Sequence, residues 1–118
     1  MNPFSTPDEI LISLSPQDMR AGIQRLTTIV TTEFGRDPMD GALYVFVSRD
    51  CRKAKLLRFE TNAWCLYYVK LLEGGFRWEH GGDRATLRVE RRQLVWLLEG
   101  LSISQPQAPL PVAAHAVL

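Results

Sequence analysis

Residues 41 to 78 form a dense run of strand-type sequence in which apolar and aromatic residues alternate with basic ones. Polar connectors divide this run into three expected strands, at residues 42–48, 54–60 and 64–71. The first is apolar on both faces, so it needs cover on both sides or a central place in a sheet. The other two alternate in character, which is typical of half-buried strands. The run therefore predicts an antiparallel meander as the centre of the fold.

Helix signals flank the meander. The sequence SPQD at residues 15–18 offers a hydroxyl cap, a proline at the first helical position and a carboxylate three residues after the cap. It predicts a long helix that runs to about Phe34 and stops at Gly35. A second, short helix is expected from residue 90 or 91 to about 99, ended by Gly100.

Two short segments complete the expected fold. Residues 10–14 favour a short strand, and residues 86–89 a short strand or an extended arm. The predicted class is α+β: an antiparallel meander of four to five strands, a long N-terminal helix packed on it and a short C-terminal helix. We expect a flexible N-terminus at residues 1–9, one domain at 10–101 and a disordered Pro/Ala-rich tail at 102–118.

Several function classes find no support in the sequence. Cys51 and Cys65 stand fourteen positions apart without a CxxC pair, which is no zinc signature, and no motif for another cofactor is present. No nucleophile is paired with a base and the carboxylates are scattered, so we expect no enzyme and no small-molecule substrate. No signal peptide and no apolar run of about 18 residues is visible. A soluble cytoplasmic protein with reduced thiols, without a membrane partner, is expected.

Charge is unevenly distributed along the chain although the net charge is only +1. Residues 1–48 hold three basic groups against six acidic ones, whereas residues 49–92 hold eleven basic groups against six acidic ones. Such a local excess indicates an anionic partner, because a patch can steer ligands even when the total charge is near zero. The alternative is that these cations merely solvate the outer faces of strands.

Basic side chains on or beside the meander are the candidate nucleic-acid contacts, because phosphate groups bind cations. The candidates are Arg49, Arg52, Lys53, Lys55, Lys70, Arg77 and, before the helix, Arg20. Two hypotheses apply to Arg20. In the first it pairs with a carboxylate and holds the helix on the sheet, and in the second it faces nucleic acid. Exposed aromatic rings could stack on unpaired bases. Core packing is the favoured role for the larger aromatics, which are Tyr44, Phe46, Phe59, Trp64 and Trp78.

Several short motifs, taken in order, resemble one protein family. They are DMR at 18–20, Gly22, DP at 37–38, GALYVF at 41–46, KLL at 55–57, CLYY at 65–68, Gly74, Phe76 with Trp78, and LLEG at 97–100. The chain resembles the small accessory protein, often labelled TnpB, that is encoded beside the DDE-type transposase in certain bacterial insertion sequences. It does not resemble the RNA-guided nucleases that share this label. One departure is ETNA at 60–63, where the family pattern has Asp-Gly-x-Gly, and it leaves the tightness of that hairpin open.

The resemblance implies a role in DNA transposition without catalytic activity of the protein's own. Two hypotheses follow. The first is an accessory factor that contacts transposon DNA through the basic meander. The second is a module that docks on the transposase or another element-encoded protein without binding DNA itself.

Overall fold

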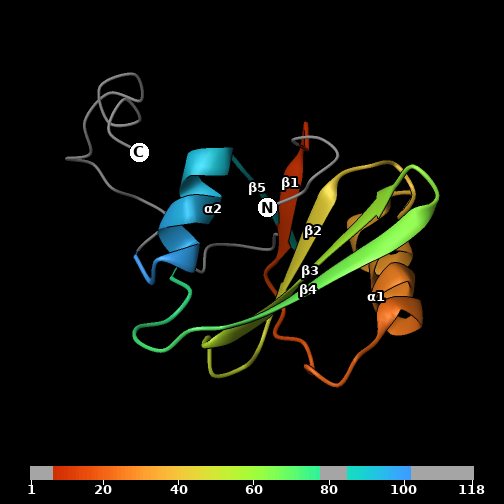
Figure 1. Ribbon diagram of the computed structural model, residues 1–118. Helices are drawn as coiled ribbons and strands as arrows, with labels where there is room; N and C mark the ends of the chain where they lie inside the picture. Colours follow the sequence, from red (N-terminus) through yellow and green to blue (C-terminus); the bar gives the residue numbers. More distant parts are fainter. Residues whose placement is uncertain (1–6, 78–84, 102–118) are drawn as a thin grey trace.

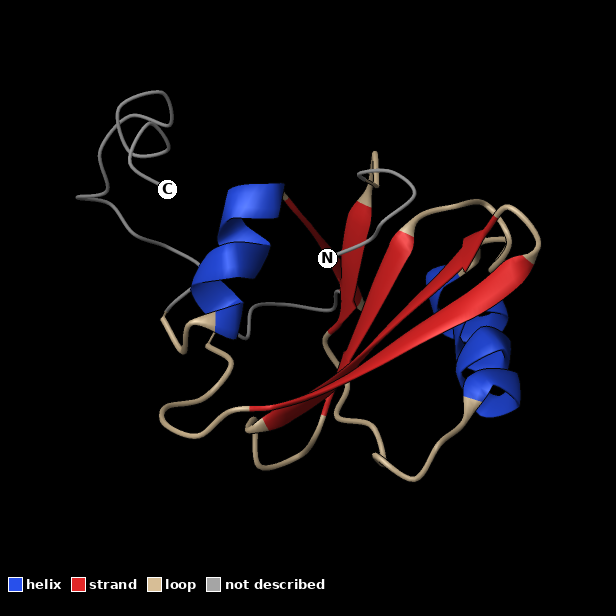
Figure 2. Cartoon of the chain, viewed as in Figure 1, coloured by secondary structure: helices blue, strands red, loops and turns tan. Residues whose placement is uncertain are grey.

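The structure, a computed structural model, describes residues 7–77 and 85–101 of the chain. A five-stranded sheet lies between two helical layers (Figures 1 and 2). The strands are β1 (Ile10–Ser13), β2 (Leu43–Val47), β3 (Lys53–Glu60), β4 (Ala63–Lys70) and β5 (Thr86–Val89). The helices are α1 (Ile23–Ile29), continued by the π-helical turn η1 (Val30–Phe34), and α2 (Arg91–Leu98).

The sheet is mixed, which corrects the prediction of a purely antiparallel meander. Its strand order is β4-β3-β2-β1-β5. The segment from β2 through β4 is the expected antiparallel meander, but β1 pairs with β2 in parallel. The reason is the helix between them, because α1 and η1 carry the chain back along the sheet so that β2 starts at the same end as β1. Strand β5 adds to the other side of β1 in antiparallel orientation.

Strand β2 occupies the centre of the sheet and is buried at every position, which confirms the prediction from its two apolar faces. Leu43, Val45 and Val47 join one core cluster, to which α2 contributes Leu94 and Leu97. Tyr44 and Phe46 join a second cluster on the opposite face, against α1. Burying apolar surface on both faces of one strand is what ties the two layers into a single fold.

The N-terminal helix is shorter than expected and begins at Ile23, with Gly22 as its N-cap, instead of near Ser15. The SPQD segment is held in another way. The Gln17 N–H donates to the Val47 carbonyl at 2.9 Å, and the Arg20 N–H donates to the Asp18 carboxylate at 2.8 Å. These two bonds fix the segment as a turn against the end of β2, so Asp18 caps a loop and not a helix. Gly35 ends the helical segment at φ 64°, as expected.

Other predicted elements lie close to their expected places. The β3–β4 hairpin closes with the pair Glu60 and Ala63, so its loop is two residues long, and Thr61 adopts φ 57° there. Helix α2 begins after Glu90, whose side chain forms a reciprocal capping box with Gln93. Gly100 follows α2 at φ 79°.

Some predictions fall on residues that the structure leaves undescribed. The described residues do not include Trp78, the tail at 102–118 or residues 1–6 of the expected N-terminal segment. The division into 1–9, 10–101 and 102–118 therefore stays a prediction. Within the described residues, no helix is long and apolar enough to cross a membrane.

Candidate nucleic-acid interface

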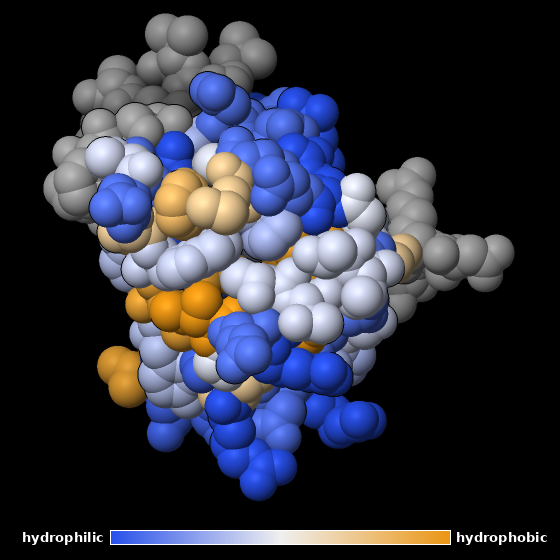
Figure 3. All heavy atoms as spheres, turned by 90° about the vertical axis from the view of Figure 1, so that its right-hand side faces the viewer, coloured by the Kyte–Doolittle hydropathy of each residue, from blue (hydrophilic) through white to orange (hydrophobic). Residues whose placement is uncertain are grey.

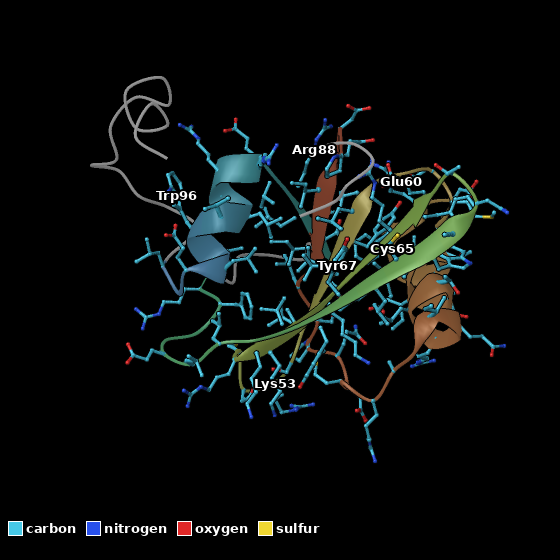
Figure 4. All side chains as sticks on the ribbon, in the orientation of Figure 1. Lys53, Glu60, Cys65, Tyr67, Arg88 and Trp96 are labelled. Carbon is cyan, nitrogen blue, oxygen red and sulfur yellow. The ribbon has the colours of Figure 1, made fainter. Side chains whose placement is uncertain are left out.

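Five of the seven candidate cations gather at one end of the sheet. Lys53 and Lys70 are direct partners in the β3–β4 register. The Leu71 N–H donates to the Arg52 carbonyl at 2.8 Å, and the Phe76 N–H donates to the Cys51 carbonyl at 2.6 Å, which brings residue 77 to the same end. We call this region the basic end; its members are Arg49, Arg52, Lys53, Lys70 and Arg77. In Figure 4 Lys53 lies at the bottom of the molecule, so the basic end is the lower end in that view. Figure 3, which keeps the same vertical axis, shows hydrophilic residues gathered over this lower end.

The β2–β3 turn is braced by its own polar groups, so the cations project from a fixed backbone. The Ser48 hydroxyl donates to the Asp50 carboxylate and accepts the Lys53 N–H at 3.1 Å, while the Arg52 N–H donates to Asp50 at 3.1 Å. The hydrogen bond from Ser48 is the main reason that the pKa of Asp50 lies below its usual value. Cys51 sits in this turn at φ 60°, a conformation that non-glycine residues rarely adopt.

Positive charge at the basic end is only partly neutralised. Lys53 lies 3.8 Å from the Asp50 carboxylate, and the Arg52 guanidinium donates to the Leu72 carbonyl at 3.3 Å. Within the part of the chain that the structure describes, Arg49, Lys70 and Arg77 are exposed and make no ion pair. The arrangement can therefore attract phosphate groups at more than one point.

Lys55 lies apart from this group and has a structural contact. Its ammonium donates to the Ala21 carbonyl at 2.8 Å and lies 5.9 Å from the centre of the Tyr68 ring. It thereby ties the loop that precedes α1 to the sheet. A cation that holds the helix on the sheet was considered at Arg20; Lys55 instead fixes the loop that leads into α1.

Arg20 forms an ion pair with Asp18 at 2.7 Å, and its side chain is 91% exposed. Both residues precede α1, so this pair does not hold the helix on the sheet. The hydrogen bond from the Arg20 guanidinium is the largest cause that lowers the pKa of Asp18 to about 2. Arg20 therefore carries its own counter-charge, which reduces its value as a phosphate contact.

The large aromatic residues mostly serve the core, as expected. Tyr44 and Phe46 are fully buried, and Phe59 packs edge-to-face on Trp64 with ring centres 4.9 Å apart. Tyr68 is the exception among the described aromatics, because it is 56% exposed and stands on β4 opposite Lys55. Exposure of this ring was not predicted, although its alternation with Tyr67 along β4 was a usable signal.

A polar cluster at the opposite end of the sheet was also not predicted from the sequence. The Arg36 guanidinium donates to the carboxylates of Glu9 and Asp40, at 2.8 Å each, and the Tyr44 hydroxyl donates to Asp40 at 2.8 Å. We call Glu9, Arg36, Asp40 and Tyr44 the Arg36 cluster. It joins the start of β1, the end of the helical segment and β2. No spacing in the sequence pointed to it, because Glu9 and Arg36 lie 27 positions apart.

The electrostatics of the Arg36 cluster follow from these contacts. The hydrogen bond from Arg36 is the main cause that lowers the pKa of Glu9. Burial raises the pKa of Asp40, but hydrogen bonds from the Ala42 N–H, the Tyr44 hydroxyl and Arg36 outweigh burial, so the net direction is down. Burial and the bond to Asp40 raise the pKa of the Tyr44 hydroxyl. Every charged group has a partner, which indicates a structural cluster.

Among the described residues, no three His, Cys, Asp or Glu side chains form a group that could hold a metal ion. Cys51 and Cys65 are both free thiols and both partly buried. That the protein uses no metal and no cofactor stays a prediction.

Comparison with known proteins agrees with the resemblance seen in the sequence. The chain is 28% identical over 107 residues to the uncharacterized protein y4hO of Sinorhizobium fredii (strain NBRC 101917 / NGR234), an alignment that covers 91% of this chain and 92% of that protein. No solved structure matches the chain. A model of the IS66 Orf2-like proteins matches residues 8–108, which is most of the sequence. The chain therefore belongs to the IS66 Orf2-like family, whose members are small accessory proteins of insertion sequences.

Proposed function

We propose that this protein is a non-catalytic accessory factor for DNA transposition and that it contacts DNA through the basic end. The observation that carries the proposal is the convergence of cations from the β2–β3 turn, the end of β4 and residue 77 on one end of the sheet. Family membership supports the role in transposition. In this role the protein acts in the cytoplasm, beside the transposon DNA and the transposase.

The chemistry of the basic end favours contact with the DNA backbone over the reading of bases. Its exposed cations are lysine and arginine side chains on a turn, at a strand end and at residue 77, and none of them lies on a helix that could enter a major groove. Each cation that neutralises a phosphate releases condensed counterions, and this release supplies the binding energy. Affinity should therefore depend strongly on salt and only weakly on sequence.

Equilibrium binding to a duplex with the transposon-end sequence tests the proposal, by fluorescence anisotropy or electrophoretic shift. Arg49→Gln and Lys70→Gln each remove one exposed cation from the basic end. The control is Arg88→Gln, because Arg88 is an exposed cation on β5 at the other end of the molecule, where it lies 3.5 Å from the Glu9 carboxylate (Figure 4). We expect each basic-end variant to weaken binding by roughly threefold to tenfold at low salt, and the control to change it little. Equal losses from all three variants would refute the assignment.

A second candidate function is docking on the transposase without DNA contact. Leu72 favours it, because this apolar side chain is 93% exposed directly after β4. Co-purification with the transposase from nuclease-treated lysate distinguishes the two. Capture that survives nuclease treatment and is lost in Leu72→Ser, combined with no DNA binding by the purified protein, would support docking and overturn the DNA proposal.

A further inference from the structure

Among the described residues, strand β4 forms one edge of the sheet, and no other described strand pairs with its outer backbone groups. Figure 1 looks onto this edge, with β4 in front of the other strands. Antiparallel pairing alternates, so every second residue turns its N–H and C=O groups toward the neighbouring strand. The Leu71 N–H bonds to Arg52, on the β3 side. It follows that Trp64, Leu66, Tyr68 and Lys70 turn their N–H and C=O groups outward.

This edge lacks the features that usually prevent pairing with another strand. Such features are prolines, bulges, short length and charged side chains. Strand β4 contains no proline, pairs with β3 over eight consecutive residues without a bulge, and has its single charge at the last position, Lys70. The other edge, β5, is only four residues long and carries Arg88 at its third position. An open apolar edge of this length is suited to accept a strand.

We propose that the occupant is β4 of a second copy of this chain, paired in antiparallel orientation about a two-fold axis that passes through Tyr67. In this register Leu66 lies opposite Tyr68 of the second copy, and Trp64 lies opposite Lys70. Every outward N–H and C=O group of β4 then finds a partner. The result is a continuous ten-stranded sheet with an isologous interface.

The side chains favour this register over the one whose axis passes through Leu66. A two-fold axis through Leu66 would place Lys70 opposite Asn62, in the hairpin turn, and would leave part of the edge unpaired. With the axis at Tyr67, Lys70 does not face Lys70 of the other copy but lies opposite Trp64, an aromatic ring that attracts cations. Leu66 and Tyr68 form an apolar pair on the α1 side, where Leu66 already packs against the core.

A disulfide tests the register directly. The axis at Tyr67 places Val69 opposite Cys65 of the second copy in a non-hydrogen-bonded pair, where Cα atoms are about 4.5 Å apart. We expect the full-length variant Cys51→Ser/Val69→Cys to form a covalent dimer under mild oxidation. The matched control adds Cys65→Ser. Its remaining thiols would lie four positions apart, about 13 Å, and should not crosslink. Equal crosslinking in both variants, or none in the first, would overturn the proposal.

Solution mass tests the interface without new cysteines. We expect the wild-type chain to shift from monomer to dimer over roughly three decades of concentration in sedimentation or light scattering. Tyr68→Pro removes an outward N–H and leaves the ladder to β3 intact, so the dissociation constant should rise at least about tenfold. Tyr68→Thr keeps the N–H and should change it less. A protein that stays monomeric throughout, or that pairs through β4 only with the transposase, would refute the second copy as occupant.

Discussion

Arg36 shows how one side chain can hold three segments of this fold together. Its guanidinium bonds to Glu9 before β1, to Asp40 in the loop before β2 and to the Tyr44 hydroxyl within β2. Replacing Arg36 would leave two carboxylates close together and remove their shared donor. The cluster is only partly exposed, so solvent compensates incompletely for this loss.

We therefore predict that Arg36→Met lowers the free energy of unfolding by about 2 kcal/mol. Urea unfolding followed by circular dichroism measures it. The control is Arg20→Met, which breaks an ion pair of similar length on the surface and should change stability much less, because both side chains of that pair are exposed. An equal effect of both substitutions would show that the Arg36 cluster does not stabilise the fold.

The same cluster predicts a pH dependence. Glu9 and Asp40 have folded-state pKa values below their ordinary values of 4.5 and 3.8. A depressed pKa in the folded state gives stability that is fully present above the unfolded-state pKa and is lost as pH falls through the folded-state value. Wild-type stability should thus decline below about pH 4.5, and Arg36→Met should decline less steeply. Parallel unfolding curves from pH 6 to pH 3 would contradict this.

At the residue scale, sequence reasoning identified the cations but not their partners. Arg20, Lys55 and Lys70 looked equivalent as charges beside a sheet. Their separate roles depend on contacts such as that between Lys55 and the Ala21 carbonyl, 34 positions apart. Local pattern carries no information about such long-range pairs, so these roles could not be predicted.

For strands and helices, the local sequence pattern predicted the boundaries correctly where tertiary contacts did not compete with it. It predicted them wrongly where tertiary contacts did. Strands β2, β3 and β4 and helix α2 were predicted within about two residues. The start of α1 was not, because the hydrogen bond from Gln17 to Val47 holds the SPQD segment in a turn. The parallel pairing of β1 and β2 was also missed, because it depends on the path of the whole crossover.

The true helix start yields a prediction. Gly22 is the N-cap of α1, its backbone is extended, and a Cβ there would meet nothing within 4 Å. Gly22→Ser supplies a capping hydroxyl and restricts the unfolded chain, so we expect a gain of about 0.5 kcal/mol in unfolding free energy. The contrasting control is Gly100→Ser. Its φ of 79° and the Glu73 carbonyl 3.1 Å from the added Cβ predict a loss of about 1–2 kcal/mol. Thermal unfolding measures the stability of the two variants relative to the wild-type chain. A Gly22→Ser variant that is less stable than the wild type would contradict the assignment of Gly22 as the N-cap.

At the scale of the whole molecule, the fold converts a charge bias in the sequence into a surface. Residues 49–92 carry the positive excess, and the β2–β3 turn, the end of β4 and residue 77 bring five of the candidate cations to one end. The sequence indicated an anionic partner, but the gathering of these cations depends on the strand register. The Arg36 cluster meanwhile holds two of the six acidic groups of the N-terminal half, Glu9 and Asp40, at the other end of the sheet.

The salt dependence of DNA binding tests this account most directly. The dissociation constant for transposon-end duplex is measured against salt concentration for the wild-type chain and for Arg49→Gln/Arg52→Gln/Lys70→Gln. If these cations contact phosphates, the slope of log affinity against log salt should become shallower by about 2 to 3 in the triple variant. Binding that is insensitive to salt, or a slope that the three substitutions leave unchanged, would contradict the assignment of the basic end as the DNA contact.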